Sequence, residues 1–389
     1  MLFNIYIENH ARLDGVEDFI SILKQIISAR GHEVKVSRDL EIDCPNIIID
    51  EFTNYICNKK IIAFKRDNPQ GNLIYLLTEF IEDRLLVRSF NFFGVFFAAS
   101  LIAAMNIYFR YRRKDFLPAS FFDYVIAILY SPLLVLYMIW HKLDNLLRYL
   151  IRKKRISLTY RLHRLAYMHM RFLGLQRMVE YADSFILSHE EIVKSVDKLS
   201  KNISKQKEVI GVIYPELDFE KIESGLFDKT GLFIEITGSV TRFRQKFIKA
   251  INRDIVVLGL NNAWKPCLAL SFSGYKNKFL KRGAFSLHPP QSKFWRYSSP
   301  TRIYRALQYN LNMPVLTKFF GQNPIENLCL ILKGDESLIQ MSEFYADKQK
   351  AIDFLQPRVM QYMETVSKAN NQVVDVMVKR FLERRASNS

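Results

Sequence analysis

Short apolar runs alternate with amphipathic stretches along the N-terminal part of the chain. The runs have the length and the β-branched content of buried strands, and they occupy residues 2–9, 32–37, 46–52, 61–66 and 73–80. Residues 16–31 carry apolar side chains at helical spacing and end at Gly31, which predicts an amphipathic helix. Strands that alternate with helices are typical of a parallel sheet with helices on both faces.

The same alternation continues at residues 182–200 and 208–217, and a second series begins after a polar, broken stretch at 215–231. The apolar runs of the second series occupy residues 231–238, 254–260, 267–274, 284–292 and 313–320. Residues 349–385 follow a helical period and form a long tail. A chain of 389 residues suits two domains better than one. We therefore expect an α/β fold with two Rossmann-like domains, residues 1–228 and residues 229–389.

Two long apolar runs interrupt the first domain. Residues 89–109 contain no charged side chain, and residues 117–140 contain only Asp123. Each run is close to the roughly 20 residues that cross a bilayer. Two full crossings would place the basic clusters at 110–114 and 152–155 on opposite faces, against the positive-inside rule. We therefore expect residues 89–140 to form a helical hairpin that dips into one leaflet. The alternative is a pair of buried core helices.

The charge of the chain is concentrated beside this hairpin. The formal net charge is +17, and the segment 110–177, which includes the basic stretch 141–177, holds fourteen Lys or Arg against three Asp. Anionic membrane lipids are the expected partner, because nucleic acid would explain the charge but not the apolar runs. The four cysteines have no metal-binding spacing, and the chain opens as a strand without signal-peptide features. These features predict peripheral or monotopic attachment at the cytoplasmic face of the inner membrane.

The helix predicted at "SSPTRIYRAL" begins with a cation where a helix dipole favours an anion. Its start supplies hydroxyl groups, free N–H groups and a guanidinium, which together suit a phosphate. The candidate residues are Ser298, Ser299, Thr301 and Arg302. A solvated arginine on a well-capped helix is the alternative.

A second helix start repeats this pattern after the apolar run 231–238. Its candidates for anion binding are Gly238, Ser239, Thr241, Arg242 and Arg244. Other helices of the chain begin with acidic residues, as in the capping box formed by Ser188 and Glu191. The two basic helix starts therefore differ from the acidic starts of other helices in this chain, and both lie in its C-terminal half.

These features together resemble the two-domain GT-B glycosyltransferases of bacterial surface-glycan assembly. The resemblance is carried by "TGSVTRFR" at 237–244 and by the segment 289–316, in which the matching positions are Ser299, Arg302, Ala306, Pro314 and Val315. It implies that the second domain binds a nucleotide-sugar donor and that the first binds the acceptor. It also implies that the last helices return to the first domain, and that the hairpin serves the membrane or a lipid acceptor.

The sequence departs from this family at the residue that binds the donor ribose. Many relatives carry a glutamate on that helix, where this chain has Arg305 and Leu307. Glu326 is a candidate substitute, and it could equally be an ordinary acidic residue of a helix. No metal-binding DxD motif stands out, and the resemblance implies neither a metal nor a cofactor.

A general base on the acceptor side is expected at the strand ends of the first domain, if the enzyme inverts the sugar configuration. The candidates are Asp14, Asp50, Glu51 and Glu79, although a structural role is the better explanation for each of them taken alone. The favoured hypothesis is transfer of a sugar from a nucleotide-diphosphate donor to a lipid-linked or surface-glycan acceptor. The alternative is a non-catalytic protein that binds membrane surfaces and keeps the double Rossmann layout.

Overall fold

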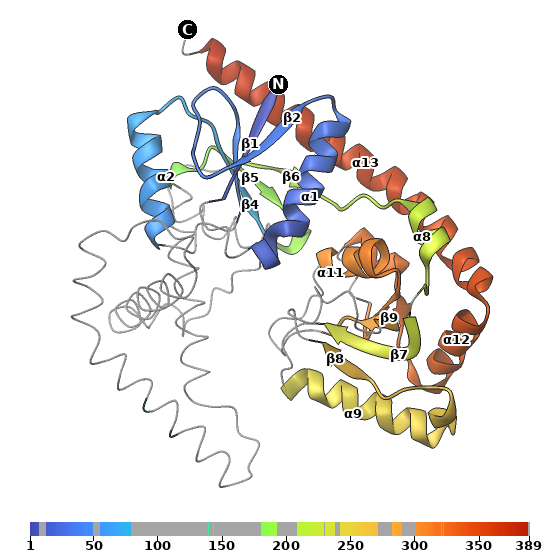
Figure 1. Ribbon diagram of the computed structural model, residues 1–389. Coiled ribbons are helices and arrows are strands. Elements are labelled where there is room, and N and C mark those ends of the chain that lie inside the picture. Colours follow the sequence, from blue (N-terminus) through green and yellow to red (C-terminus); the bar gives the residue numbers. More distant parts are fainter. Residues whose placement is uncertain are drawn as a thin grey trace.

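The described part of the chain folds into two α/β domains that are joined by an extended segment and by one long helix (Figure 1). The computed structural model describes residues 1–7, 13–49, 55–78, 139, 143, 180–192, 208–228, 230–237, 242–270, 282–289, 300–319, 321 and 323–387.

The first domain is built on a six-stranded parallel sheet with the order β2-β1-β3-β4-β5-β6. Its strands are β1 (Leu2–Tyr6), β2 (Glu33–Ser37), β3 (Asn46–Ile49), β4 (Leu73–Leu77), β5 (Ser184–Leu187) and β6 (Val209–Val212). Every residue of β3, β4 and β5 is buried, because helices cover both faces of a parallel sheet. This burial explains the unbroken apolar runs of the sequence.

The second domain is built on a five-stranded parallel sheet with the order β11-β10-β9-β7-β8. Its strands are β7 (Thr230–Thr237), β8 (Leu268–Leu270), β9 (Arg282–Leu287), β10 (Met313–Leu316) and β11 (Leu330–Ile331). The two parallel sheets confirm the predicted α/β class with two Rossmann-like domains.

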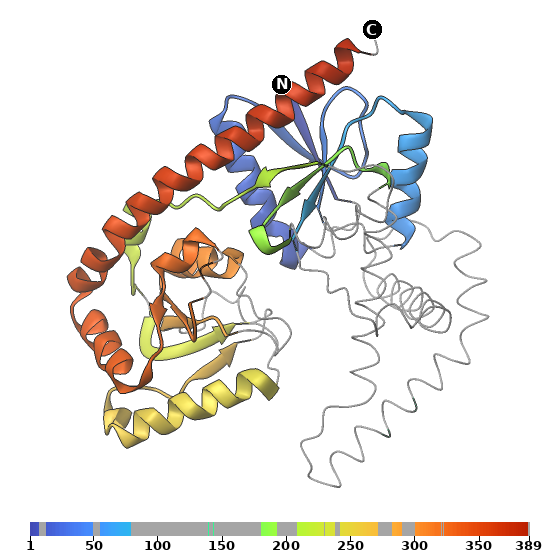
Figure 2. The same ribbon diagram turned by 180° about the vertical axis from the view of Figure 1, so that it is seen from behind.

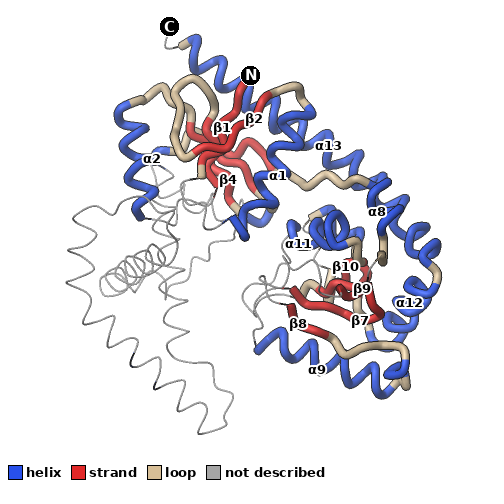
Figure 3. Tube along the Cα trace, in the orientation of Figure 1, coloured by secondary structure: helices blue, strands red, loops and turns tan. Residues whose placement is uncertain are grey.

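Helices connect the strands and cover the sheets (Figure 3). The first domain contains α1 (Leu13–Ala29), α2 (Tyr55–Asp67) and the 3₁₀ turn η3 (Glu190–Ile192). The remaining elements are α8 (Phe219–Gly225), α9 (Arg242–Val257), η4 (Leu260–Asn262), α11 (Pro300–Arg305), the π-helical turn η5 (Ala306–Asn310), η6 (Pro324–Leu328), α12 (Gly334–Ala346) and α13 (Lys348–Ala386).

Two predicted strands are wrong. Residues 61–66 belong to α2, because β3 and β4 are parallel neighbours and the chain needs a crossover between them. Residues 254–257 end helix α9, where Ile251 and Ile255 are buried one turn apart while Val256 and Val257 face solvent. In both segments, β-branched residues suggested a strand although the buried positions follow a helical period.

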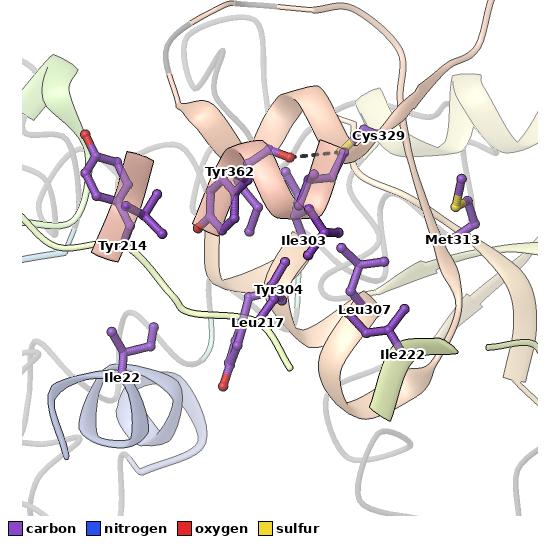
Figure 4. Packing of buried hydrophobic residues seen from close by; sticks show 14 of the residues in the cluster. Ile22, Tyr214, Leu217, Ile222, Ile303, Tyr304, Leu307, Met313, Cys329 and Tyr362 are labelled. Carbon is purple, nitrogen blue, oxygen red and sulfur yellow. Dashed lines mark hydrogen bonds between the residues drawn. The ribbon is translucent and has the colours of Figure 1, made fainter. Parts of the chain in front are cut away.

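The polar stretch predicted as a linker contains α8 and is held by α13. Asn370 is fully buried, its Oδ1 accepts from the backbone N–H of Tyr214, and its Nδ2 donates to the Tyr214 carbonyl. The hydroxyl of Tyr362 donates to the carbonyl of Pro215 over 2.6 Å. One apolar cluster continues through this junction from the first domain into the second, and Figure 4 shows Ile22 near the junction residues. The connection is therefore a packed core and not a loose tether.

Helix α13 runs from the second domain back along the first, so that the C-terminus lies near the N-terminus (Figures 1 and 2). It contacts η6 and α12 at one end and β6 and α1 farther along. Its final turns form ion pairs with the first domain, including Arg384 with Asp183 and Arg380 with Glu208. The long helical tail of the sequence thus bridges the two sheets.

The apolar hairpin predicted at residues 89–140 lies outside the described residues, apart from the single position Ile139. Among the helices that the structure does describe, none is both long enough and apolar enough to cross a membrane.

Candidate functional site

The candidate site lies at the carboxyl edge of the second sheet, where the chain changes direction. From β7 the chain passes through α9 to β8 on one side, whereas β9 and β10 lie on the other side of β7. The carboxyl ends of β7 and β9 therefore flank the switch point of this sheet, which is where ligands bind in open α/β sheets. Helix α9 begins after β7 and helix α11 begins after β9, so both predicted basic helix starts belong to this edge.

Arg244, in the first turn of α9, is among the largest fully buried side chains of the described chain, with 1% of its surface exposed. Burial, followed by the positive charge of Arg302, lowers the pKa of the Arg244 guanidinium to about 10. This value still leaves Arg244 charged at neutral pH. The effect of Arg302, from the first turn of α11, shows that the two helix starts place their cations close together.

His288 follows β9 directly and completes the cluster. Its backbone N–H donates to the carbonyl of Val315 over 2.8 Å, and its side chain is 3% exposed. Burial, followed by the charges of Arg302 and Arg244, lowers the pKa of the His288 imidazole to about 3. The imidazole is therefore neutral at physiological pH, and it lies within the field of both guanidinium groups.

The cluster of Arg244, His288 and Arg302 combines chemical groups that can bind an anion. Two like charges at a mostly buried place repel one another, and a bound anion would relieve that repulsion. Guanidinium groups bind phosphate oxygens through paired hydrogen bonds, and a neutral imidazole can add one donor. Thr301 is also buried at the start of α11. A phosphate or diphosphate fits this combination of charge and donors.

Glu326 lies in η6, which contacts α11, and its side chain is buried. Its Oε2 accepts from the backbone N–H of Gly321 over 3.0 Å, so this carboxylate holds the loop that follows β10. Glu326 therefore has a structural role. Contact with a donor ribose stays a prediction.

The side-chain positions of several predicted site residues are not described by the structure. Gly238, Ser239, Thr241, Ser298, Ser299, Asp50, Glu51 and Glu79 lie outside the described residues. Arg242 begins α9 and Asp14 lies in the first turn of α1, but their side chains are not described. The predicted acceptor-side base is therefore untested.

Arg305, which stands where relatives carry the glutamate that binds the ribose, contacts the first domain. Arg305 donates to Asp18 of α1 over 2.5 Å, and both side chains are largely buried. Burial raises the pKa of the Asp18 carboxyl, and the charge of Arg305 opposes this effect. Helix α11 thus carries Arg302 in the cluster with Arg244 and His288 and, one turn later, Arg305 in contact with the first domain.

Sequence reasoning missed His288, and it also missed a polar group in the first domain. His189 and Glu190 lie just beyond β5, after Ser188, and Glu190 accepts from the Tyr214 hydroxyl over 3.0 Å. Their place after a buried strand was the available signal, but Ser188 to Glu191 had been interpreted as a helix cap. Within the described ranges, no group of three or more His, Cys, Asp or Glu side chains could hold a metal ion.

No protein-family model matches the chain, and no curated protein matches it. Among solved structures, the chain is similar to a UDP-forming α,α-trehalose-phosphate synthase from Burkholderia xenovorans, with 10% identity over 97% of this chain and 79% of that one, at a TM-score of 0.41. It is also similar to an α,α-trehalose 6-phosphate synthase from Burkholderia multivorans, with 11% identity over 89% of this chain and 100% of that one, at a TM-score of 0.33. At these values the likeness says nothing about substrate.

Proposed function

We propose that the protein is a glycosyltransferase that takes a sugar from a nucleotide-diphosphate donor bound at the carboxyl edge of the second sheet. The observation that carries this proposal is the convergence of Arg244 and Arg302, from two helix starts that flank one switch point, with His288 at the end of β9. A diphosphate matches the two guanidinium groups in charge. The packed junction between the domains keeps the donor site in a defined position relative to the first sheet.

The acceptor is proposed to be lipid-linked or part of a surface glycan, and the reaction to take place at the cytoplasmic face of the membrane. This part of the proposal rests on the apolar runs at 89–140 and on the basic stretch that follows them. The donor is a substrate, and the proposal includes neither a cofactor nor a metal ion.

The cluster suggests how the transfer would be assisted. As the bond between the sugar and the diphosphate breaks, negative charge develops on the leaving phosphate oxygens. We expect Arg244 and Arg302 to stabilise that charge, and the burial of Arg244 would strengthen its interaction. His288 is neutral and can donate a hydrogen bond to the same oxygens without adding to the repulsion between the arginines.

The test is a thermal-shift screen of the full chain with nucleotide sugars, nucleoside diphosphates, inorganic pyrophosphate and unphosphorylated nucleosides. Diphosphate-bearing ligands should stabilise the protein, by about 2.7 kcal/mol at one hundred times the dissociation constant, and nucleosides should not. A nucleotide sugar that binds is then incubated with lipid-linked acceptors, and release of nucleoside diphosphate is measured. Binding without release for any acceptor would favour the non-catalytic alternative.

A further inference from the structure

The solvent face of helix α9 carries apolar side chains that the fold does not cover. Val256 and Val257 are 63% and 74% exposed, although they close a helix whose inner face buries Ile251 and Ile255. At 3.6 residues per turn, Val257 points almost opposite to Ile255. The two valines therefore contribute nothing to the core of the second domain.

The same face of α9 is cationic. Lys246, Lys249 and Arg253 are exposed at intervals of three and four residues, and the valines continue this row toward the end of the helix. The one acidic residue of the helix sequence, Asp254, pairs with Arg253 over 3.0 Å. The row formed by residues 246, 249, 253, 256 and 257 is called the α9 stripe below. It ends in two apolar side chains and keeps a positive net charge.

The neighbouring segment widens the apolar end of the stripe. The backbone N–H of Cys267 donates to Oδ1 of Asn252 over 2.7 Å, which holds the start of β8 beside α9. Leu268 is 47% exposed there, and Lys265 is exposed as well. Figure 1 shows that α9 covers the side of the second sheet that is turned away from the first domain. The stripe is thus open to a partner that approaches the second domain from outside.

We propose that the α9 stripe docks on an anionic lipid surface. Lysine and arginine side chains interact with headgroup phosphates, while valine and leucine side chains enter the boundary with the acyl chains, and an interfacial helix uses both at once. Nucleic acid would use the cations but would leave the valines and Leu268 in water. The inference goes beyond the donor site, and it depends neither on that site nor on residues 89–140.

The experiment places an environment-sensitive dye on the full chain through Val257→Cys, with the dye-treated unsubstituted chain as blank. Vesicles contain phosphatidylcholine alone or with phosphatidylglycerol, each with a trace of lipid that carries a quencher near the headgroup. Quenching is expected with the anionic vesicles and should weaken with added salt. Lys246→Gln with Lys249→Gln should lower the docking equilibrium constant, read from the quenching, about tenfold or more.

The matched control carries the dye at Met360→Cys, which is 64% exposed on α13. It should remain unquenched on the same vesicles. Nucleoside-diphosphate binding measured in parallel should be unchanged by the two lysine substitutions, which separates this inference from the proposed donor site. The inference is overturned if the chain binds anionic vesicles while position 257 stays unquenched, or if the chain does not bind them. Concentration-dependent burial of the dye without vesicles would also overturn it, because the occupant would then be a second copy of the chain.

Discussion

Protonation of His288 should make the second domain sensitive to acid, and this sensitivity can be measured without any ligand. The pKa of the imidazole is about 3 in the folded protein against an ordinary value of 6.5. Between these two values the unfolded chain binds one proton more than the folded chain. Stability must therefore fall as the pH falls below 6.5, and the loss is complete only below about pH 3.

The magnitude follows from the size of the shift. One pKa unit corresponds to about 1.4 kcal/mol, so the full difference is about 5 kcal/mol, and about 2 kcal/mol of it appears between pH 6.5 and pH 5. The residue is buried next to two arginines, so solvent screens this effect only weakly. A bound phosphate should oppose the effect, because a negative charge beside the imidazole raises its pKa.

The assay is urea unfolding of the full chain at several pH values from 5 to 8, compared with the variant His288→Asn. The variant can be less stable at every pH, but its stability should fall less steeply, by about 1.2 kcal/mol per pH unit near pH 5.5. His32→Asn is the comparison, because partial burial also lowers the pKa of His32 but neither Arg244 nor Arg302 acts on it. If His288→Asn leaves the slope unchanged, the imidazole is not held in the field of the two arginines.

Two further substitutions test the junction between the domains. Arg305→Ala should destabilise the protein by about 2–3 kcal/mol, because it leaves the largely buried carboxylate of Asp18 without its ion-pair partner. Adding Asp18→Asn should restore part of this loss in chemical denaturation, whereas Arg253→Ala, whose side chain is 74% exposed, should change stability by less than about 0.5 kcal/mol. Asn370→Ala should lower the free energy of unfolding by about 2–4 kcal/mol, because it leaves a buried backbone N–H and a buried C=O of the connecting segment unsatisfied. A melting temperature close to that of the unsubstituted chain would contradict the packed junction.

The sequence predicted the elements whose signal is local. The apolar runs of β3, β4 and β5 predicted strands because every position in them is buried. The segments 61–66 and 254–260 were wrongly predicted as strands, because over so few residues their β-branched side chains resemble the pattern of a strand. For residues 61–66, the helix is required because β3 and β4 are parallel and need a crossover between them. For residues 254–257, the helix is shown by the exposure of Val256 and Val257. Both facts are properties of the fold and not of the local sequence.

The candidate site depended on contacts between distant parts of the chain. The basic helix starts at Arg244 and Arg302 were visible in the sequence because they lacked acidic residues, and the hypothesis that they share one ligand needed the strand order to bring them together. His288 carries no motif and was read as part of a strand end. The pair of Arg305 and Asp18 spans 287 residues, so no local pattern could have predicted it.

The most direct test of the account is calorimetric titration of nucleoside diphosphates into the full chain and into Arg302→Ala. Loss of a charge-assisted hydrogen bond should weaken binding about ten- to a hundredfold, whereas Arg302→Lys should restore only part of the affinity, because an ammonium cannot form the paired contact. Arg253→Ala, a substitution of an exposed arginine in the last turns of α9, should bind like the unsubstituted chain. Equal affinity of Arg302→Ala and the unsubstituted chain for every diphosphate that binds would contradict a donor site at the cluster of Arg244, His288 and Arg302.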